Sequence, residues 1–444
     1  MTEMSEMFIR SLHEGVVPAT GCTEPIAVAY AAANCMHYLT DQHVCSIDVQ
    51  VSPNVMKNAM AVMVPGVGEP GLLIAAATGA LAGDPAAGLS VIADLDPELL
   101  PAIKELANSG KVTAGVAPVE DDLYVEVTIT DKLNKVKVCI ASDHTNIFKI
   151  ERDDQDLLEK PRPAAHEANE VKKYLQGVTF KDVWDFALNA PLSDIAFMLD
   201  SGTVNMTIAE AGLESDYGLT LGKSIDRAKN TGFGSGIEGD LENRILAYTA
   251  AASDARMGGA SLPAMSNSGS GNQGISATVP VCVVANFVDA NEEQLTRALT
   301  LSNLAAIYIH SFLPVLSAFC ATDSAGMGAA AASIYLLGGD RKQAEMAIKN
   351  MAGDAAGMVC DGAGCSCAMK VATATSSMYR SVNLARQGVV IPASNGLVCE
   401  DIDETIRGIG KLGTIGMKGT DPAVLDVMMA KSKPAKTPRP KVGA

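Results

Sequence analysis

Hydrophobic and polar residues alternate in the first third of the chain. Three segments show this pattern: 45–51, 123–130 and 135–141. A period of two predicts half-buried strands, and the short polar turn between the last two segments predicts a β-hairpin. Two segments between the strands are predicted helices: 71–83 and 97–108. This part of the chain is therefore predicted to form a mixed α/β unit.

The pattern changes to a helical one in the second half of the chain. Helices are predicted at 180–189, 204–213, 240–257, 291–313, 326–337, 341–358, 370–387, 402–416 and 422–430. Asn291, Asp340 and Asp421 stand at expected helix starts. Ala, Gly, Met and Ser dominate here, and small residues let helices approach closely. We expect a compact helical bundle with a buried site.

These patterns predict an α+β fold. Residues 151–173 are rich in charge, proline and alanine and lack periodicity, so they are the expected linker. The predicted organisation is a helical N-terminal segment that faces the helical domain, a mixed α/β domain, a helical domain and a disordered basic tail: 1–40, 41–160, 161–430 and 431–444.

Composition and charge narrow the function classes. The 444 residues are 48% hydrophobic, which excludes a disordered chain. A net charge of −17 argues against nucleic acid as a partner. The first residues show no cationic or apolar signal region, so we expect a cytoplasmic protein whose ten cysteines are reduced. The uncharged segment 301–321 has the length of a membrane span but contains His310 and Pro314, which favours a buried core helix.

The pattern GxGxxG occurs three times, starting at Gly66, Gly234 and Gly269. The first copy follows a predicted strand, as a dinucleotide-binding loop requires. However, Glu69 would repel a pyrophosphate and Pro70 removes a backbone donor. We therefore do not expect a nucleotide site there.

The third copy belongs to a run of nine small or polar residues, 266–274. Its hydroxyls, amides and unshielded N–H groups suit a carboxylate or a phosphate. The alternative is an ordinary surface loop, but the apolar run 275–288 that follows would anchor it to the core. The candidate binding residues are Ser268, Gly269, Ser270, Gly271, Asn272 and Gln273.

Cysteine placement carries the strongest chemical signal. Four cysteines fall in the helical half: Cys320, Cys360, Cys365 and Cys367. Glycines let the 360–367 segment fold tightly, and Cys320 is predicted to end an apolar helix and precede a flexible segment. Converging thiolates in a reducing compartment suit an iron–sulfur cluster or zinc, whereas isolated cysteines pack as small hydrophobes. The latter is expected for Cys35, Cys45, Cys139, Cys282 and Cys399.

Cys22 stands in a turn that leads into a predicted helix, with Thr23 and Glu24 after it. Unpaired N–H groups at a helix start lower the pKa of a thiol, which would suit a general base or acid. The alternative is a passive turn in which Thr23 is the N-cap. His310 is expected to be a core histidine whose hydrogen bonds are satisfied, and the alternative is that it lines the same pocket as Cys320. His144 is expected to be an exposed loop residue.

Several longer segments resemble the L-cysteine desulfidase family, relatives of the iron–sulfur L-serine dehydratases. They are GCTEPIAVA (21–29), RMGGASLPAMSNSGSGNQGI (256–275), LSAFC (316–320), AGMGAAAASIYLLGG (325–339), MAGDAAGMVCDGAGCSCAMKV (351–371) and LGTIGMKGTDPAVLDVMMAK (412–431). The resemblance covers most of the chain. It implies a small mixed domain beside a helical catalytic domain.

The resemblance also implies a site and a reaction. Three cysteines would hold a [4Fe–4S] cluster with one open iron: Cys320, Cys360 and Cys367. Cys22 would transfer a proton, with Thr23 and Glu24 in the catalytic set, and the SGSGNQG loop would contact the substrate. The implied reaction converts L-cysteine to pyruvate, ammonia and sulfide. L-Serine ammonia-lyase activity and a non-catalytic, metal-binding or redox-sensing role are the alternatives.

The sequence departs from the family pattern at three places. Cys365 is an extra cysteine, Ala321 and Thr322 follow the first ligand cysteine, and 310–315 lacks the expected basic and glycine residues. These departures bear on substrate preference. The expected partner is a small amino acid, without nucleic acid or membrane, and a homodimer is one assembly to be tested.

Overall fold

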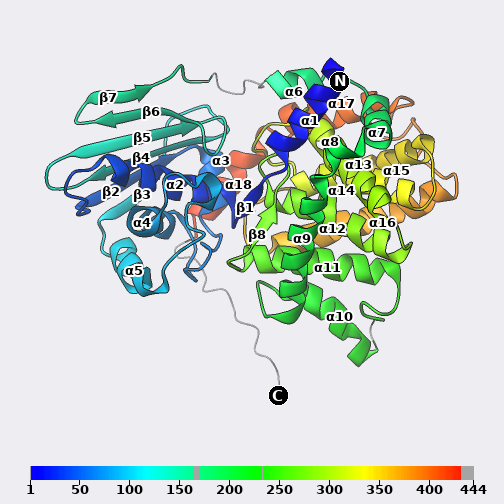
Figure 1. Cartoon of the computed structure of the whole chain (residues 1–444), viewed down its shortest axis with the longest axis horizontal. Helices are drawn as coiled ribbons and strands as arrows, with labels where there is room; N and C mark the ends of the chain where they lie inside the picture. The colour runs from blue at the N-terminus through cyan, green and yellow to red at the C-terminus, as the bar shows by residue number, and fades with distance from the viewer. Residues whose placement is uncertain (1, 164–169, 233, 432–444) are drawn as a thin grey trace.

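The computed structural model describes residues 2–163, 170–232 and 234–431. It confirms the predicted α+β class, because a six-stranded sheet with its helices lies beside a larger group of helices (Figure 1). Residues 432–444 of the predicted tail lie outside the described residues.

The sheet has the strand order β3-β2-β4-β5-β6-β7. Its strands are β2 (Ser46–Val51), β3 (Val112–Val116), β4 (Tyr124–Thr130), β5 (Lys135–Ala141), β6 (Ile147–Arg152) and β7 (Gln155–Glu159). Only β2 and β3 are parallel among these pairs. The predicted hairpin is confirmed as β4 and β5, with Val127 opposite Val138. Part of the expected linker is instead β7, while its residues 164–169 lie outside the described part of the chain.

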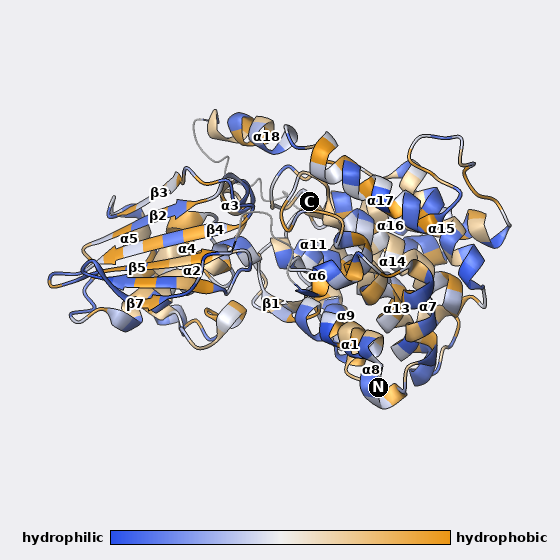
Figure 2. Cartoon of the chain, turned by 90° about the horizontal axis from the view of Figure 1, so that it is seen from above, coloured by the Kyte–Doolittle hydropathy of each residue, from blue (hydrophilic) through white to orange (hydrophobic). Residues whose placement is uncertain are grey.

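Helices cover one face of this sheet. They include α2 (Thr23–Tyr38), α3 (Pro53–Ala59), α4 (Leu72–Ala82), η1 (Gly88–Ser90), η2 (Pro97–Leu99) and α5 (Leu100–Asn108). Helix α2 packs on β4 and β5 and against α4. Valines and isoleucines on alternate strand positions meet alanines of α2 and α4 in one core (Figure 2). We call this part the sheet region.

The remaining helices surround a second core, which we call the helical region. They are α1 (Glu3–Gly15), α6 (Glu170–Leu175), α7 (Phe180–Asn189), α8 (Leu192–Ile195), α9 (Met198–Glu214), α10 (Leu221–Thr231), α11 (Leu241–Met257), α12 (Gly271–Phe287), α13 (Glu292–His310), α14 (Ala321–Leu336), α15 (Arg341–Asp354), α16 (Cys367–Arg386), α17 (Ile402–Lys411) and η3 (Leu412–Gly416). The final helix, α18 (Thr420–Met429), packs against α3 and adds Leu425 to the core of the sheet region.

Several helical predictions need correction, because helices including α10 and α12 were not predicted. Helix α12 is buried on nearly every side, so no 3.6-residue period of apolar residues is visible in its sequence. Cys320 does not end a helix: α13 stops at His310, Cys320 is the N-cap of α14, and the segment expected to be flexible is its first turns.

The N-terminal segment contributes to both regions. Helix α1 packs against α6 and α13, whereas α2 belongs to the sheet region. Between them, β1 (Pro18–Thr20) pairs antiparallel with β8 (Pro263–Met265) of the helical region. The turn that carries Cys22 is thereby held at the junction of the two regions.

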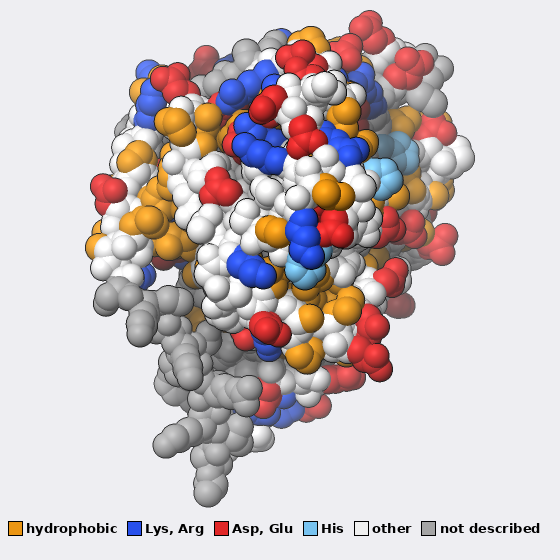
Figure 3. All heavy atoms as spheres, turned by 90° about the vertical axis from the view of Figure 1, so that its left-hand side faces the viewer, with side chains coloured by type: hydrophobic (Ala, Val, Ile, Leu, Met, Phe, Trp, Pro, Cys, Tyr) orange, Lys and Arg blue, Asp and Glu red, His pale blue; other side chains and the backbone are white. Residues whose placement is uncertain are grey.

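No described helix combines the length and hydrophobicity that crossing a bilayer demands. Residues 301–310 are the buried second half of α13, as the interruption by polar residues indicated. On the face at the sheet end of the molecule, acidic and basic side chains are interspersed (Figure 3).

Candidate active site

A cavity of about 100 Å³ lies where the two regions meet. Eleven of the twelve residues selected from the sequence line it: Cys22, Thr23, Glu24, Ser268, Gly269, Ser270, Asn272, Gln273, Cys320, Cys360 and Cys367. The twelfth, Gly271, begins α12 directly behind this wall. Segments that are hundreds of residues apart in the chain therefore converge on one small space.

The Cys22 turn is held tightly. Gly21 has φ +77°, and a Cβ there would lie 2.3 Å from Pro65 Cγ. Cys22 itself is the N-cap of α2, so the alternative in which Thr23 caps this helix is wrong. Thr23 Oγ1 instead donates to the Gly269 carbonyl at 3.0 Å, which ties the turn to the SGSGNQG loop.

Burial controls the chemistry of Cys22. It raises the pKa of the thiol to about 12, while the charge of Arg256 opposes the shift. The expectation of a lowered pKa is therefore wrong, because the loss of solvation raises the pKa of the thiol by more than the N-terminus of the helix lowers it. Arg256 Nη2 lies 3.5 Å from Cys22 Sγ and is the nearest source of thiolate stabilisation.

Arg256 is a site residue that the sequence reasoning missed. It lies in the last turn of α11, is 4% exposed, and donates from Nη2 to the Gly21 carbonyl at 2.8 Å. A Cβ on Gly271 would lie 2.2 Å from Arg256 Nε, so this glycine leaves room for the guanidinium. An arginine directly after an alanine-rich stretch, at the start of one of the quoted motifs, was the available signal.

The SGSGNQG segment is only partly a loop. Ser268 and Gly269 have positive φ values of 48° and 82°, and Ser270 is the N-cap of α12, its hydroxyl accepting from Gln273 N at 3.3 Å. Residues 271–274 form the first helical turn, which corrects the prediction of a nine-residue loop. The positive end of a 17-residue helix dipole thus faces the cavity, an arrangement that favours an anion.

The three predicted ligand cysteines are positioned by two neighbouring segments. A bridge between Phe319 and Val359 is closed by Cys320 N donating to Met358 O at 2.9 Å and Cys360 N donating to Ala318 O at 2.7 Å. Cys367 opens α16. Burial raises the pKa of Cys320, with Cys360 adding to it, and burial likewise raises the pKa of Cys367 to about 11.

The three thiols are of the kind that an iron–sulfur cluster uses as ligands. Within the described residues, no group of three or more His, Cys, Asp or Glu side chains is arranged to hold one metal ion. All three cysteines are nevertheless free and line the same cavity. A cluster brings its own sulfides and spans more space than one ion, and thiolates are its usual ligands. The donor set therefore fits an iron–sulfur cluster.

Other sequence candidates take different places. Cys365 is not among the described residues lining the cavity, and its Sγ lies 4.0 Å from Met257 O. Cys35 and Cys139 are buried as expected, whereas Cys45 is exposed, because its strand begins one residue later, and Cys282 and Cys399 are partly exposed.

His144 and His310 both lie in surroundings that differ from those expected. His144 is buried, not exposed, and its Cε1 lies 3.4 Å from the position of a Cβ on Gly269. His310 lines the cavity and is 8% exposed, but neither ring nitrogen has a hydrogen-bond partner. It is therefore not a satisfied core histidine.

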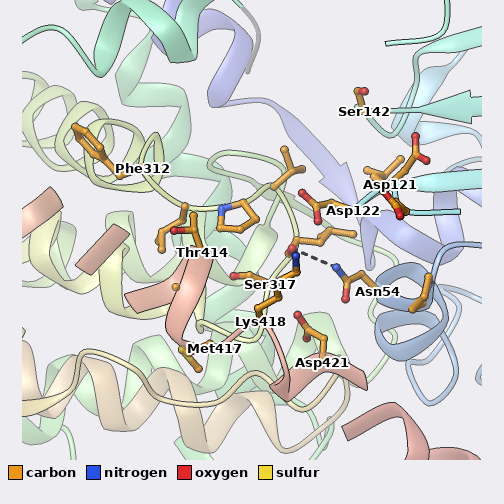
Figure 4. Close-up of a pocket in the computed structure, with 18 of the residues that line it drawn as sticks. Asn54, Asp121, Asp122, Ser142, Phe312, Ser317, Thr414, Met417, Lys418 and Asp421 are labelled. Atoms are coloured by element: carbon orange, nitrogen blue, oxygen red, sulfur yellow. Dashed lines mark hydrogen bonds between the residues drawn. The ribbon is translucent and has the colours of Figure 1, made fainter. Parts of the chain in front are cut away.

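A larger cleft of about 780 Å³ adjoins the cavity. Val315, Leu316 and Ser317, between α13 and α14, line both spaces. Figure 4 shows Asn54 of α3 bonded to this segment, and Asn54 Nδ2 donates to Leu316 O at 3.3 Å. Residues 315–317 therefore form part of the wall of both spaces.

The chain is similar in sequence to one protein family and to several known proteins. A model of the serine dehydratase alpha chain family matches residues 87–426. A UPF0597 protein of Latilactobacillus sakei is 65% identical over 97% of this chain and 100% of its own length. A UPF0597 protein of Chromobacterium violaceum is 49% identical over 96% of this chain and 97% of its own length.

Proposed function

Because the chain belongs to the serine dehydratase alpha chain family, we propose that it is an iron–sulfur-dependent L-cysteine desulfidase. The observation that carries the proposal is the convergence of Cys22, the SGSGNQG segment and three free cysteines on one cavity. A cluster binder alone would need only the three cysteines. The alternative of a non-catalytic sensor leaves the other two features without a role.

Cys320, Cys360 and Cys367 would hold the cluster. When bound, a cluster with one open iron supplies a Lewis acid for the carboxylate and the leaving sulfur of the substrate. The N-terminus of α12 and Arg256 favour the carboxylate in the cavity. A reducing cytoplasm would keep all of these thiols free.

Cys22 would act on the α-proton. Its thiol would first have to ionise, because burial raises its pKa. The charge of Arg256, 3.5 Å from Sγ, opposes that rise, and the Thr23 contact to Gly269 fixes the turn against the substrate loop. Cys22 takes the α-proton, the C–S bond breaks, and sulfide and aminoacrylate form. Water then hydrolyses aminoacrylate to pyruvate and ammonia.

L-Serine ammonia-lyase activity is the second candidate, supported by the family to which the chain belongs. The same residues would eliminate hydroxide in place of sulfide. Sulfide is the better leaving group and has the higher affinity for iron, which favours L-cysteine.

Anaerobic reconstitution with iron and sulfide, followed by pyruvate and sulfide assays, tests the proposal. We expect pyruvate from L-cysteine at a higher kcat/KM than from L-serine. Cluster-replete protein that turns over neither amino acid would overturn both lyase candidates, and a preference for L-serine would select the second.

The Cys22→Ser variant separates proton transfer from cluster binding. We expect it to lose about 100-fold or more in kcat, the usual weight of a general base, with unchanged iron and sulfide content. Cys45→Ser removes an exposed thiol and serves as the matched control. Loss of iron from Cys22→Ser would show that Cys22 is a ligand instead.

A further inference from the structure

The cavity contains two buried, opposite charges that do not neutralise one another. Glu24 is 6% exposed and Arg256 is 4% exposed, and both line the cavity. Within the described residues, neither side chain forms an ion pair. Burying a charge without a counter-charge is costly, so a ligand with both signs of charge would be stabilised here.

Unsatisfied hydrogen-bonding atoms gather at the same place. Ten buried side-chain N or O atoms of the described residues lack a partner, and five belong to residues that line the cavity. These five are Asn58 Oδ1, Arg256 Nε, Gln273 Oε1, His310 Nδ1 and His310 Nε2. Buried polar atoms without partners are uncommon, and such a concentration indicates a site for a polar ligand.

The orientation of Asn58 determines which part of the ligand it meets. Its Nδ2 donates to Glu24 Oε1 at 2.8 Å, so its Oδ1 is left as an acceptor. Thr23 Oγ1 is 3.2 Å from the other carboxylate oxygen, Glu24 Oε2. Glu24 and Asn58 together present negative charge and an unused acceptor, which is the complement of an ammonium group.

We propose that Glu24 and Asn58 form the subsite that binds the α-ammonium group of the substrate, while Arg256 and the start of α12 receive its carboxylate. This rests on the proposed function for the location of the substrate. It assigns Glu24 to recognition and not to proton transfer. The subsite would make the enzyme select α-amino acids over acids of the same shape that lack the amino group.

A comparison of two ligands tests the subsite directly. L-Cysteine and 3-mercaptopropionate share the thiol and the carboxylate and differ only in the amino group. Their Kd values are measured by anaerobic calorimetry on reconstituted protein with Cys22→Ser as the background, because the active protein would consume L-cysteine during the titration. We expect this background to prefer L-cysteine, and Glu24→Gln added to it, which retains the shape of the side chain, to reduce the preference by about tenfold or more.

Two further variants complete the design. Asn58→Leu removes the acceptor and should also lower the preference, while Glu345→Gln changes a carboxylate of α15 outside the cavity and should leave it unchanged. The preference is a ratio within each variant. A general loss of structure would weaken the binding of both ligands and leave the ratio of their Kd values unchanged.

The outcomes distinguish this subsite from the proposed reaction. A Cys22→Ser background without preference for L-cysteine, or a Glu24→Gln variant of it that retains the full preference, would overturn the subsite. A preference that depends on Glu24, together with a wild type that forms no pyruvate, would support the subsite and overturn the lyase.

Discussion

At the residue scale, the missing side chain of Gly271 leaves the space that the buried guanidinium of Arg256 occupies. Gly271 opens α12, and a Cβ there would come within 2.2 Å of Arg256 Nε and 2.6 Å of its Cζ. The guanidinium is held against the Gly21 carbonyl by the same packing. Glycine is needed at this position for space, since Gly271 does not have a positive φ.

Gly271→Ala is therefore expected to displace Arg256. The overpacking should reduce the free energy of unfolding by about 1–3 kcal/mol, and kcat/KM for L-cysteine should fall with it. Urea denaturation and steady-state assays measure the two effects. Gly419→Ala is the control, because a Cβ there meets nothing within 4 Å; equal behaviour of the two variants would contradict the role of Gly271.

His310 makes stability depend on pH. Burial, and next the charge of Lys172, lowers the pKa of His310 from 6.5 to about 3. The unfolded chain binds a proton on this residue below about pH 6.5, whereas the folded chain binds it only near pH 3. Acid therefore favours the unfolded state, and the contribution of neutral His310 is complete above pH 6.5 and is lost as the pH falls.

Protonation of His310 in the unfolded chain should lower the free energy of unfolding by about 2 kcal/mol as the pH falls from 7 to 5. His310→Gln should show a correspondingly weaker loss over the same range. Denaturant titrations at several pH values measure the difference, with His43→Gln as a control that removes an exposed imidazole. Parallel curves for wild type and His310→Gln would contradict the prediction.

At the element scale, α2 and α4 cross with almost no space between their backbones. A Cβ on Gly79 of α4 would lie 2.1 Å from the Ala29 carbonyl oxygen of α2. Because α2 also begins with Cys22 and Glu24, the position of this helix matters for the cavity. The close crossing explains why small residues dominate both helices.

Gly79→Ala should force the two helices apart. We expect a loss of about 1–3 kcal/mol in the free energy of unfolding, because the clash is with backbone, which cannot move aside. In α17, a Cβ on Gly408 would lie 3.8 Å from the Leu397 carbonyl oxygen, which is an ordinary contact. Gly408→Ala should therefore raise the free energy of unfolding by up to about 1 kcal/mol, because alanine has the higher helix propensity. Urea denaturation of both variants tests the contrast, and a neutral Gly79→Ala would refute the close crossing.

At the scale of the whole molecule, one ion pair links the C-terminal helix, the sheet region and the cavity. Lys57 of α3 is 1% exposed and lies 2.5 Å from Asp421 of α18, which is 15% exposed. The same Nζ donates to the Cys360 carbonyl at 3.2 Å. Helix α18 therefore supports a segment that carries a proposed cluster ligand.

Asp421→Asn should cost more stability than Lys57→Met. The first variant leaves a buried ammonium without its counter-ion, at about 3–5 kcal/mol, whereas the second leaves a carboxylate that can reach water. Methionine also retains the packing of the lysine stem. Urea denaturation gives both values, and a reversed order would show that Lys57 has another source of stabilisation.

The sequence by itself determined the α+β class, the β4–β5 hairpin and most helices, because local periodicity and caps are properties of neighbouring residues. It also selected residues that the fold brings to one cavity. It could not show α12, which is buried on nearly every side and therefore lacks an amphipathic period, or the start of α14 at Ala321, whose first turns are buried as well.

Only the tertiary structure decided the state of those residues. Whether Cys22 has a lowered or a raised pKa depends on desolvation, which no local pattern reports. The roles of Arg256, Asn58 and His310 depend on distant segments meeting at the junction of two regions. Local sequence specifies which groups are present, whereas long-range packing determines their partners, their burial and therefore their chemistry.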